Sequence, residues 1–138
     1  MKDSYLSREE LVKFIATLPT RRLAAGAVIR KERGELLLVQ PNYKDGWILP
    51  GGTVEAGEAP KPGCFREVEE ELGLRLAPGR LLLVFHGLAR GVWGDSTYYM
   101  YDAGVIAKNT PVTLQTEELI TYEWVAPEQL REYVNPGF

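Results

Sequence analysis

The sequence of 138 residues contains one cysteine and one histidine. Cys64 alone cannot form an internal disulfide, and this fits a reducing compartment. We expect Cys64 to be a small buried residue rather than a nucleophile. Because His86 is the sole histidine, it cannot supply a cluster of histidine metal ligands, and we expect it at the surface of a loop or strand end.

Excess positive charge and long apolar runs are also lacking. The net charge is -3, whereas nucleic-acid surfaces need clustered Lys and Arg. We therefore expect no general nucleic-acid binding, and an anionic substrate must be attracted by local features. No apolar run reaches membrane-spanning length, and the polar start Met1–Ser4 does not resemble a signal peptide. These features predict a cytoplasmic protein with no membrane partner.

The composition suits one domain preceded by a short arm. With 45% hydrophobic residues, the chain can form a single packed core. Ser7 and Glu10 form a capping-box pattern, apolar residues follow at helical spacing, and Pro19 ends the segment. We expect a helical arm at 1–19 and the main domain at 20–138. The apolar face of the arm must cover the sheet or another subunit, so a homodimer is possible.

Strand patterns dominate the rest of the chain. Apolar runs at 21–30 and 35–40 are separated by a polar turn, which predicts a hairpin. The segment 47–52 is expected to be a strand that enters a tight turn at its glycines. Further strands are expected at 81–85, 97–107 and 121–125, and a last helix near Pro127. Strands outnumber helices and their connections are mixed. The pattern predicts an α/β sandwich with a mixed β-sheet between helices.

The most informative stretch runs from Gly52 to Leu74. Glu67, Glu70 and Glu71 stand at i, i+3 and i+4, so a helix places their carboxylates on one face. Packed like charges destabilise a helix and call for a cation, and oxygen ligands suit Mg²⁺ or Mn²⁺.

The same stretch predicts how this helix is bounded and packed. Apolar residues Phe65, Val68 and Leu72 form a stripe on the opposite side, which should face the core. Gly73 is expected to end the helix in a left-handed conformation. The prolines in 59–63 predict that the helix begins late, near Pro62.

These residues resemble the Nudix box, which is Gly, five residues, Glu, seven residues, then Arg-Glu-apolar-x-Glu-Glu-x-Gly-apolar. The constrained positions are filled by Gly52, Glu58, Arg66, Glu67, Val68, Glu70, Glu71, Gly73 and Leu74. At average residue usage, a chance match is on the order of one in ten million or less. The resemblance implies a Nudix-type α/β/α sandwich. It also implies hydrolysis of a nucleoside diphosphate linked to another moiety, by attack of water on a phosphorus.

The resemblance also implies a role for individual box residues. Glu67, Glu70, Glu71 and the backbone of Gly51 would bind the Mg²⁺ or Mn²⁺ ion. Arg66 would steady the acids through a charge-assisted hydrogen bond. When bound, the ion would neutralise charge on the diphosphate oxygens and lower the pKa of the attacking water.

Other box roles concern the loop before the helix. Gly51 and Gly52 would let the backbone approach the metal and a phosphate. Glu58 would either bind the metal through water or fix the loop.

The general base has several candidates. In similar proteins it is a box glutamate or an acid on a later loop. Glu118 lies six residues before Trp124, a spacing similar to that of many relatives, and is the preferred outside candidate. Glu117 and Glu123 are alternatives, and an ordinary surface role for Glu118 stays open.

Substrate contacts are expected in segments that flank the active face of similar proteins. Tyr43, Trp93 and Tyr98 could stack on a base, and Arg22 or Lys44 could take a terminal phosphate. Tyr98, Tyr99 and Tyr101 lie in a predicted strand, where aromatic residues more often belong to the core.

Two alternatives remain beside the hydrolase. One is a catalytically silent Nudix-fold domain that binds nucleotides or regulates. The intact set of acids disfavours it, because a silent domain has no need of such a repulsive cluster. The other is a diphosphate isomerase of the same fold. It is disfavoured because that chemistry uses additional Cys and Glu catalysts in the pocket, whereas the one cysteine of this chain lies inside the predicted helix.

Overall fold

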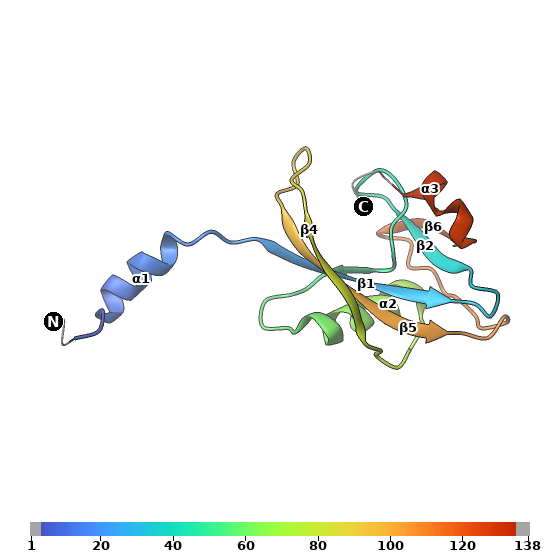
Figure 1. The fold of residues 1–138 in the computed structure, drawn as a ribbon, viewed down its shortest axis with the longest axis horizontal. Coiled ribbons are helices and arrows are strands. Elements are labelled where there is room, and N and C mark those ends of the chain that lie inside the picture. Colours follow the sequence, from blue (N-terminus) through green and yellow to red (C-terminus); the bar gives the residue numbers. More distant parts are fainter. Residues whose placement is uncertain (1–3, 135–138) are drawn as a thin grey trace.

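The computed structural model describes residues 4–134, which form an arm and a mixed sheet flanked by helices (Figure 1). The helical segments are α1 (Arg8–Ala16), α2 (Pro60–Leu72), the 3-10 turn η1 (Pro127–Gln129) and α3 (Leu130–Tyr133). The strands are β1 (Arg22–Arg30), β2 (Leu36–Pro41), β3 (Gly51–Thr53), β4 (Leu81–Gly87), β5 (Ser96–Val105) and β6 (Leu119–Val125). The predicted arm at 1–19 and domain at 20–138 extend beyond the described residues by 1–3 and 135–138.

The sheet is mixed, as the sequence predicts. Its strand order is β4-β5-β1-β2-β6, and β3 pairs with β1 beside this path. β1 and β5 run parallel, whereas the other pairs are antiparallel. The predicted hairpin after β1 is confirmed by the pairing of Arg30 with Leu36. This topology brings the start of β1, the end of β4 and the start of β5 together, since Arg22 and Gly87 both pair with Ser96.

Helices cover both faces of this sheet, which confirms the predicted sandwich. On one face Val68 and Leu72 of α2 share a buried cluster with Ala25 and Ala27 of β1. A smaller cluster on the other face contains Leu38 of β2, against which residues of α3 pack. Alternate residues of a strand point to opposite faces, so β1 contributes to both layers. None of the helices in residues 4–134 has the length and apolar character needed to span a bilayer.

Helix α2 follows the predicted pattern except at its start. The stripe of Phe65, Val68 and Leu72 is buried, and Gly73 ends the helix with φ 66°. The helix begins at Pro60 rather than near Pro62, so the expected late start is wrong. Both prolines fit because the N–H groups of a first helical turn have no partner within the helix.

The strand expected to begin at Trp47 and to turn at the glycines is also displaced. Only Ile48 forms a bridge before the glycines, to Val39, and regular pairing begins at Gly51. Pro50 interrupts the segment because it has no N–H to donate to a neighbouring strand. The segment therefore runs as a loop from its bridge with β2 to β1, with which it pairs as the three-residue strand β3.

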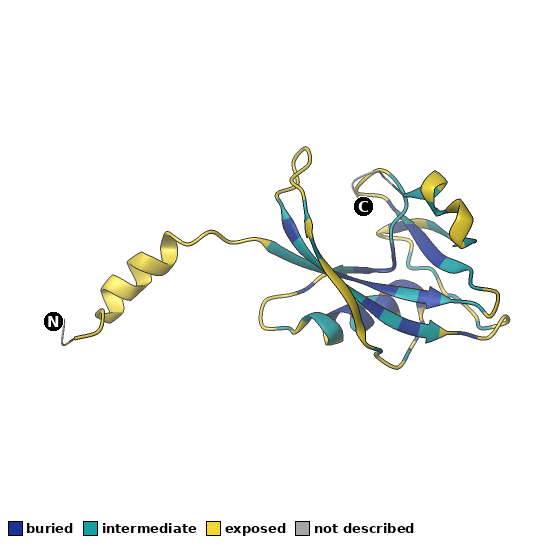
Figure 2. Cartoon of the chain, in the orientation of Figure 1, coloured by how far each residue is buried: buried dark blue, intermediate teal, exposed yellow. Residues whose placement is uncertain are grey.

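The arm does not cover the sheet. Helix α1 has the predicted capping box, in which the Ser7 side chain accepts from the Glu10 N–H and the Glu10 carboxylate accepts from the Ser7 N–H. No residue of α1 is buried, and Phe14 and Ile15 are 53% and 54% exposed. Figure 2 shows the arm extending away from the sheet with exposed residues on every side. Of the two alternatives for its apolar face, the preferred one, cover of the sheet of the same chain, is therefore wrong.

Candidate active site

The loop into β3 brings backbone against the acids of α2. Gly51 has φ 146°, and a Cβ there would lie 2.0 Å from the Ala25 carbonyl oxygen, so a side chain cannot fit. The Gly51 N–H donates to Oε1 of Glu71 at 2.8 Å. A Cβ on Gly52 would lie 2.9 Å from the Glu67 carboxylate carbon. The two glycines thus let the chain pass directly over two box carboxylates.

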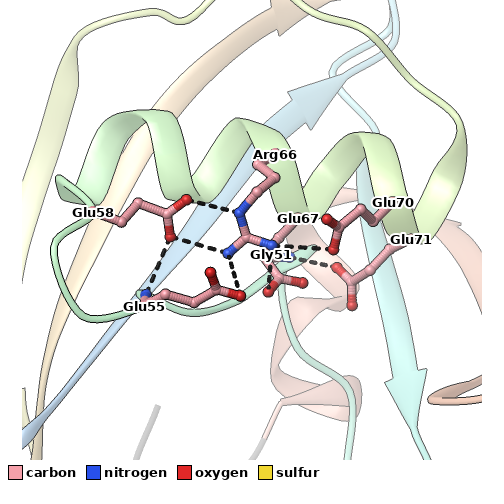
Figure 3. A network of polar contacts seen from close by, with 7 residues as sticks. All are labelled: Gly51, Glu55, Glu58, Arg66, Glu67, Glu70 and Glu71. Carbon is pink, nitrogen blue, oxygen red and sulfur yellow. Dashed lines mark hydrogen bonds and ion pairs between the residues drawn. The ribbon is translucent and has the colours of Figure 1, made fainter.

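Arg66 lies at the centre of the polar network in Figure 3. Its guanidinium forms a fork with Glu58, with Nε–Oε2 at 2.7 Å and Nη2–Oε1 at 3.0 Å. Nη1 donates to Glu70 at 3.1 Å and lies 3.3 Å from Glu67. Such bidentate charged pairs are among the stronger hydrogen bonds. Arg66 therefore holds the acids of the helix and the preceding loop together.

Glu58 ties the loop to the helix. Besides accepting from Arg66, its Oε1 accepts from the Glu55 N–H at 3.1 Å. These bonds, chiefly those from Arg66, hold the pKa of Glu58 below its usual value. A Cβ on Gly63 would lie 2.6 Å from this carboxylate, so Glu58 lies directly against the helix. The contacts favour the loop-fixing role over the water-mediated metal role.

Glu71 is buried with only partial compensation. It is 3% exposed, and its pKa is raised to about 8, chiefly because burial disfavours the charged form. The Gly51 N–H opposes this rise, whereas the neighbouring acids, Glu67 first, reinforce it. Burial likewise raises the pKa of Glu67, against the effect of Arg66. Additional positive charge near Glu67 and Glu71 would therefore favour the ionised form of both carboxylates.

The chemistry of these groups fits a divalent cation. Glu67, Glu70 and Glu71 are oxygen donors on one face of α2, which suits hard ions such as Mg²⁺. Across residues 4–134, no three His, Cys, Asp or Glu side chains are already arranged around one point. Glu67 and Glu70 are turned toward Arg66 instead. Arg66 would therefore hold Glu67 and Glu70 on the helix face where an ion would bind.

A cavity of about 280 Å³ opens beside the acids. It is lined by all six residues predicted to contact substrate and by two of the predicted catalytic acids: Arg22, Tyr43, Lys44, Gly51, Gly52, Trp93, Glu67 and Glu118. Arg66, Glu70 and Glu71 are not among its lining residues. The structure thus brings segments from across the chain to one site beside the box helix.

Cations and aromatic rings form the wall of this cavity. The Arg22 guanidinium lies 4.7 Å from the centre of the Trp93 ring. The Lys44 ammonium lies 5.9 Å from the same ring, and Tyr43 and Trp93 are 6.1 Å apart between ring centres. Partial desolvation and the charge of Arg22 lower the pKa of Lys44. The wall offers positive charge and ring surface to the same ligand.

Among the three candidate bases outside the box, Glu118 lines the cavity. Its N–H donates to Oε1 of Gln115 at 2.9 Å, and its carbonyl accepts from the Asn42 N–H at 2.8 Å. The charge of Glu118 contributes to the raised pKa values of Glu67 and Glu71. The alternatives Glu117 and Glu123 are exposed and do not line this cavity. Among the three candidates, only Glu118 lies where it can act on the same ligand as the box.

The remaining sequence expectations concern single residues. Cys64 is 1% exposed and packs in the core beside α2, as expected, and burial raises the pKa of its thiol to about 12. His86 is exposed on β4, 3.6 Å from Asp95. Tyr99 packs against the core and Tyr101 is buried, as expected. For Tyr98 a core role was preferred over a place beside the substrate, but it lines the cavity while its ring packs on Phe85.

Comparison with known proteins identifies the family of this chain. The NUDIX domain family model matches residues 20–137, which is most of the chain. The chain belongs to the Nudix family. It is 32% identical to Nudix hydrolase 5 of Arabidopsis thaliana over 131 residues, covering 89% of this chain and 42% of that protein. This Nudix chain thus spans less than half of that relative's length.

Two further matches cover different shares of the molecule. The chain is 46% identical over 67 residues to diphosphoinositol polyphosphate phosphohydrolase 3-alpha of Mus musculus, covering 47% of this chain and 41% of that protein. The crystal structure of the MutT protein from Methanosarcina mazei superposes with a TM-score of 0.71 at 30% identity, covering 84% of this chain and 85% of the other. The chain accordingly has the domain of Nudix hydrolases, and enzymes of this family generally use divalent metal ions.

Proposed function

We propose that this Nudix hydrolase cleaves the diphosphate of a nucleoside diphosphate linked to another moiety, with Mg²⁺ or Mn²⁺ as the metal. One observation carries the proposal. The predicted cavity residues Arg22, Lys44 and Trp93 face the same space as Glu67 and Glu118. A ligand in that space meets acids that can hold a metal and cations that can hold phosphate. Rings that can stack on a base line the same space.

The residues of the box would divide the work of binding the metal. Glu67, Glu70 and Glu71 would be the carboxylate ligands, with the Gly51 backbone beside them. Arg66 would hold these carboxylates in place, since it already bonds Glu70 and lies beside Glu67. When bound, the ion would neutralise negative charge on the diphosphate oxygens and lower the pKa of the attacking water.

The rest of the cavity would position the substrate. Arg22 and Lys44 would hold a phosphate, and the Gly52 backbone would allow the diphosphate to lie close to the acids. Glu118 would accept the proton of the attacking water as oxygen bonds to phosphorus and the bridging P–O bond breaks. The two products would each leave with a phosphate. A box glutamate as the base is the alternative.

The activity is tested by incubating the protein with Mg²⁺ or Mn²⁺ and a panel of diphosphates, followed by phosphorus NMR. The panel contains nucleoside triphosphates, oxidised nucleotides, nucleotide-sugars, dinucleoside polyphosphates and a diphosphoinositol polyphosphate. Cleavage of a nucleoside diphosphate derivative supports the proposal. Metal binding without cleavage of any compound would favour the silent nucleotide-binding or regulatory domain.

We also propose that the arm at 1–19 is separate from the catalytic domain and mediates a homodimer. The family match begins at residue 20, just beyond the arm. Leu11, Phe14 and Ile15 are all 45% or more exposed, although they recur at the spacing of one helix face. Strand β4 at the edge of the sheet also exposes Leu81 and Leu83. A second copy of the chain could cover both surfaces by a reciprocal exchange.

We place this activity in the cytoplasm. A chain with one cysteine, buried beside the box helix, gains nothing from an oxidising compartment. Location of a tagged protein in its source cell by microscopy or fractionation tests the assignment.

A further inference from the structure

A second cavity of about 290 Å³ adjoins the first. The two cavities share six lining residues: Arg22, Ala24, Lys44, Ile48, Trp93 and Tyr98. The shared set includes both cations and the indole of the wall already described. A ligand bound beside the acids can therefore continue past Arg22 and Lys44 into the second cavity.

The residues that only the second cavity has differ in character from the acids of the first. They include Trp47, Phe85 and Leu88, together with Arg90 and Ser96. Glu67 and Glu118 line the first cavity but not the second. The first cavity thus carries the acids that suit a metal ion. The second cavity, called the far end below, is rich in aromatic rings and aliphatic surface.

The rings of the far end are fixed by the sheet and by a short hairpin. Phe85 on β4 packs on Tyr98 of β5 with ring centres 4.9 Å apart. Arg90 and Trp93 exchange two backbone hydrogen bonds of 2.9 Å across the turn of the hairpin. Next to them Asp95 forms a 3.0 Å ion pair with Arg21. The wall that carries Trp93 is therefore held from both sides.

We infer that the second cavity binds the base of the nucleoside whose diphosphate is cleaved in the first. The inference rests on the proposed function and extends it, because it fixes the direction in which the substrate lies. The diphosphate would lie at Glu67 and Gly52 and the phosphate on the nucleoside side at Arg22 and Lys44. The base would lie in the part of the second cavity that Trp47, Phe85 and Trp93 line.

The composition of the second cavity disfavours the other moieties that a diphosphate can carry. An inositol polyphosphate presents several phosphates, which call for many Lys and Arg contacts. The second cavity offers Arg22, Lys44 and Arg90, together with the acidic Asp45. A flat apolar ring surface is the feature that it has in excess, and bases bind such surfaces by stacking.

The three tryptophans provide a direct test with the unmodified protein. Trp47 and Trp93 line the second cavity, whereas Trp124 lies on β6 beneath Lys31 and lines neither cavity. We would titrate adenosine, guanosine, cytidine and uridine without metal and follow the indole N–H signals by NMR, with ribose as the base-free control. At least one nucleoside should shift the Trp47 and Trp93 signals and leave Trp124 unchanged. If no nucleoside shifts them, or if ribose shifts them equally, the inference is wrong.

A matched pair of variants locates the site. Leu88 lines the second cavity and is 77% exposed, whereas Val92 on the same hairpin is 99% exposed and lines neither cavity. Both positions tolerate a polar residue without loss of core. Leu88→Asp should weaken nucleoside binding at least about fivefold, while Val92→Asp should leave it within about twofold. Equal effects of the two variants would contradict the assignment.

Hydrolysis assays separate this inference from the proposed function. Removing a stacking contact costs on the order of tenfold to a hundredfold in affinity, so a base-free ribosyl diphosphate should be cleaved with a kcat/KM at least about tenfold lower. If base-bearing and base-free compounds are cleaved equally well, the base site is wrong but the hydrolase stands. If nucleosides bind at Trp47 and Trp93 but no diphosphate is cleaved, the base site stands and the hydrolase proposal fails.

Discussion

Glu71 shows how one residue joins the fold to the chemistry of the site. It lies on the helix face that packs against the loop of β3, and its carboxylate accepts a hydrogen bond from the Gly51 backbone. One backbone donor only partly offsets the cost of burying a charge. The site is therefore electrostatically incomplete without a cation, and this expectation can be measured in the metal-free protein.

The pH dependence of stability tests this expectation. Burial raises the pKa of Glu71 to about 8 in the folded protein, whereas in the unfolded chain it has its ordinary value of 4.5. The folded state thus binds more protons in this window, so the free energy of unfolding falls as pH rises from about 4.5 to about 8. Urea unfolding of the metal-free protein across this range measures the slope. In Glu71→Gln the free energy of unfolding should fall less steeply with pH. An unchanged slope would show that the pKa of Glu71 is not raised in the folded protein.

Glu118 carries the second residue-level prediction. Its side chain lines the cavity beside Glu67 on a loop that is fixed by Asn42 and Gln115 through backbone bonds. Glu118→Gln should lower kcat at least about tenfold, because general-base catalysis typically contributes 10²–10⁴-fold. Glu117→Gln is the matched control, since Glu117 lies outside the cavity. Unchanged turnover in Glu118→Gln would remove this residue from the mechanism.

At the scale of elements, the site depends on the contact between α2 and the loop that contains Gly51 and Gly52. Gly51→Ala would place a methyl group 2.0 Å from the Ala25 carbonyl oxygen at φ 146°. Strained backbone and overpacking cost on the order of 1–3 kcal/mol each. Thermal unfolding should therefore show a loss of at least about 2 kcal/mol. Gly94→Ala is the control because nothing lies within 4 Å of its added Cβ, and equal losses in both variants would contradict the account.

The elements also show what the sequence could predict. The acids of α2 and the buried stripe of Val68 and Leu72 followed from helical spacing alone, because the period of a helix is fixed. The start of α2 did not, because proline satisfies the first turn at more than one position. Trp93 was predicted to contact substrate, whereas Phe85 and Trp47 were missed. These residues come together only because β4 pairs with β5 and because the loop that carries Trp47 follows a particular course. Neither feature can be predicted from a local sequence pattern.

For the whole molecule, the arm is the feature that the single chain leaves unexplained. Its capping and spacing were predicted, but the surface that it covers was not, because an amphipathic face specifies burial without naming a partner. Gel filtration with light scattering should give a dimer for the full chain and a monomer after removal of residues 1–19. Charged substitutions at Leu11 and Phe14 should have the same effect. A monomer in every case would end the dimer proposal.

The central claim is tested most directly by comparing two glutamates of α2 in one assay. Glu71 faces the glycine loop, whereas Glu69 bonds Arg75 on the outer side of the helix at 2.8 Å. The measurement is kcat/KM for the best substrate of the panel at saturating Mg²⁺ or Mn²⁺. The account predicts a loss of at least about a hundredfold in Glu71→Gln, since removing a metal ligand removes charge stabilisation in the transition state. It predicts less than about a threefold change in Glu69→Gln. Full activity in Glu71→Gln, or equal losses in both variants, would contradict it.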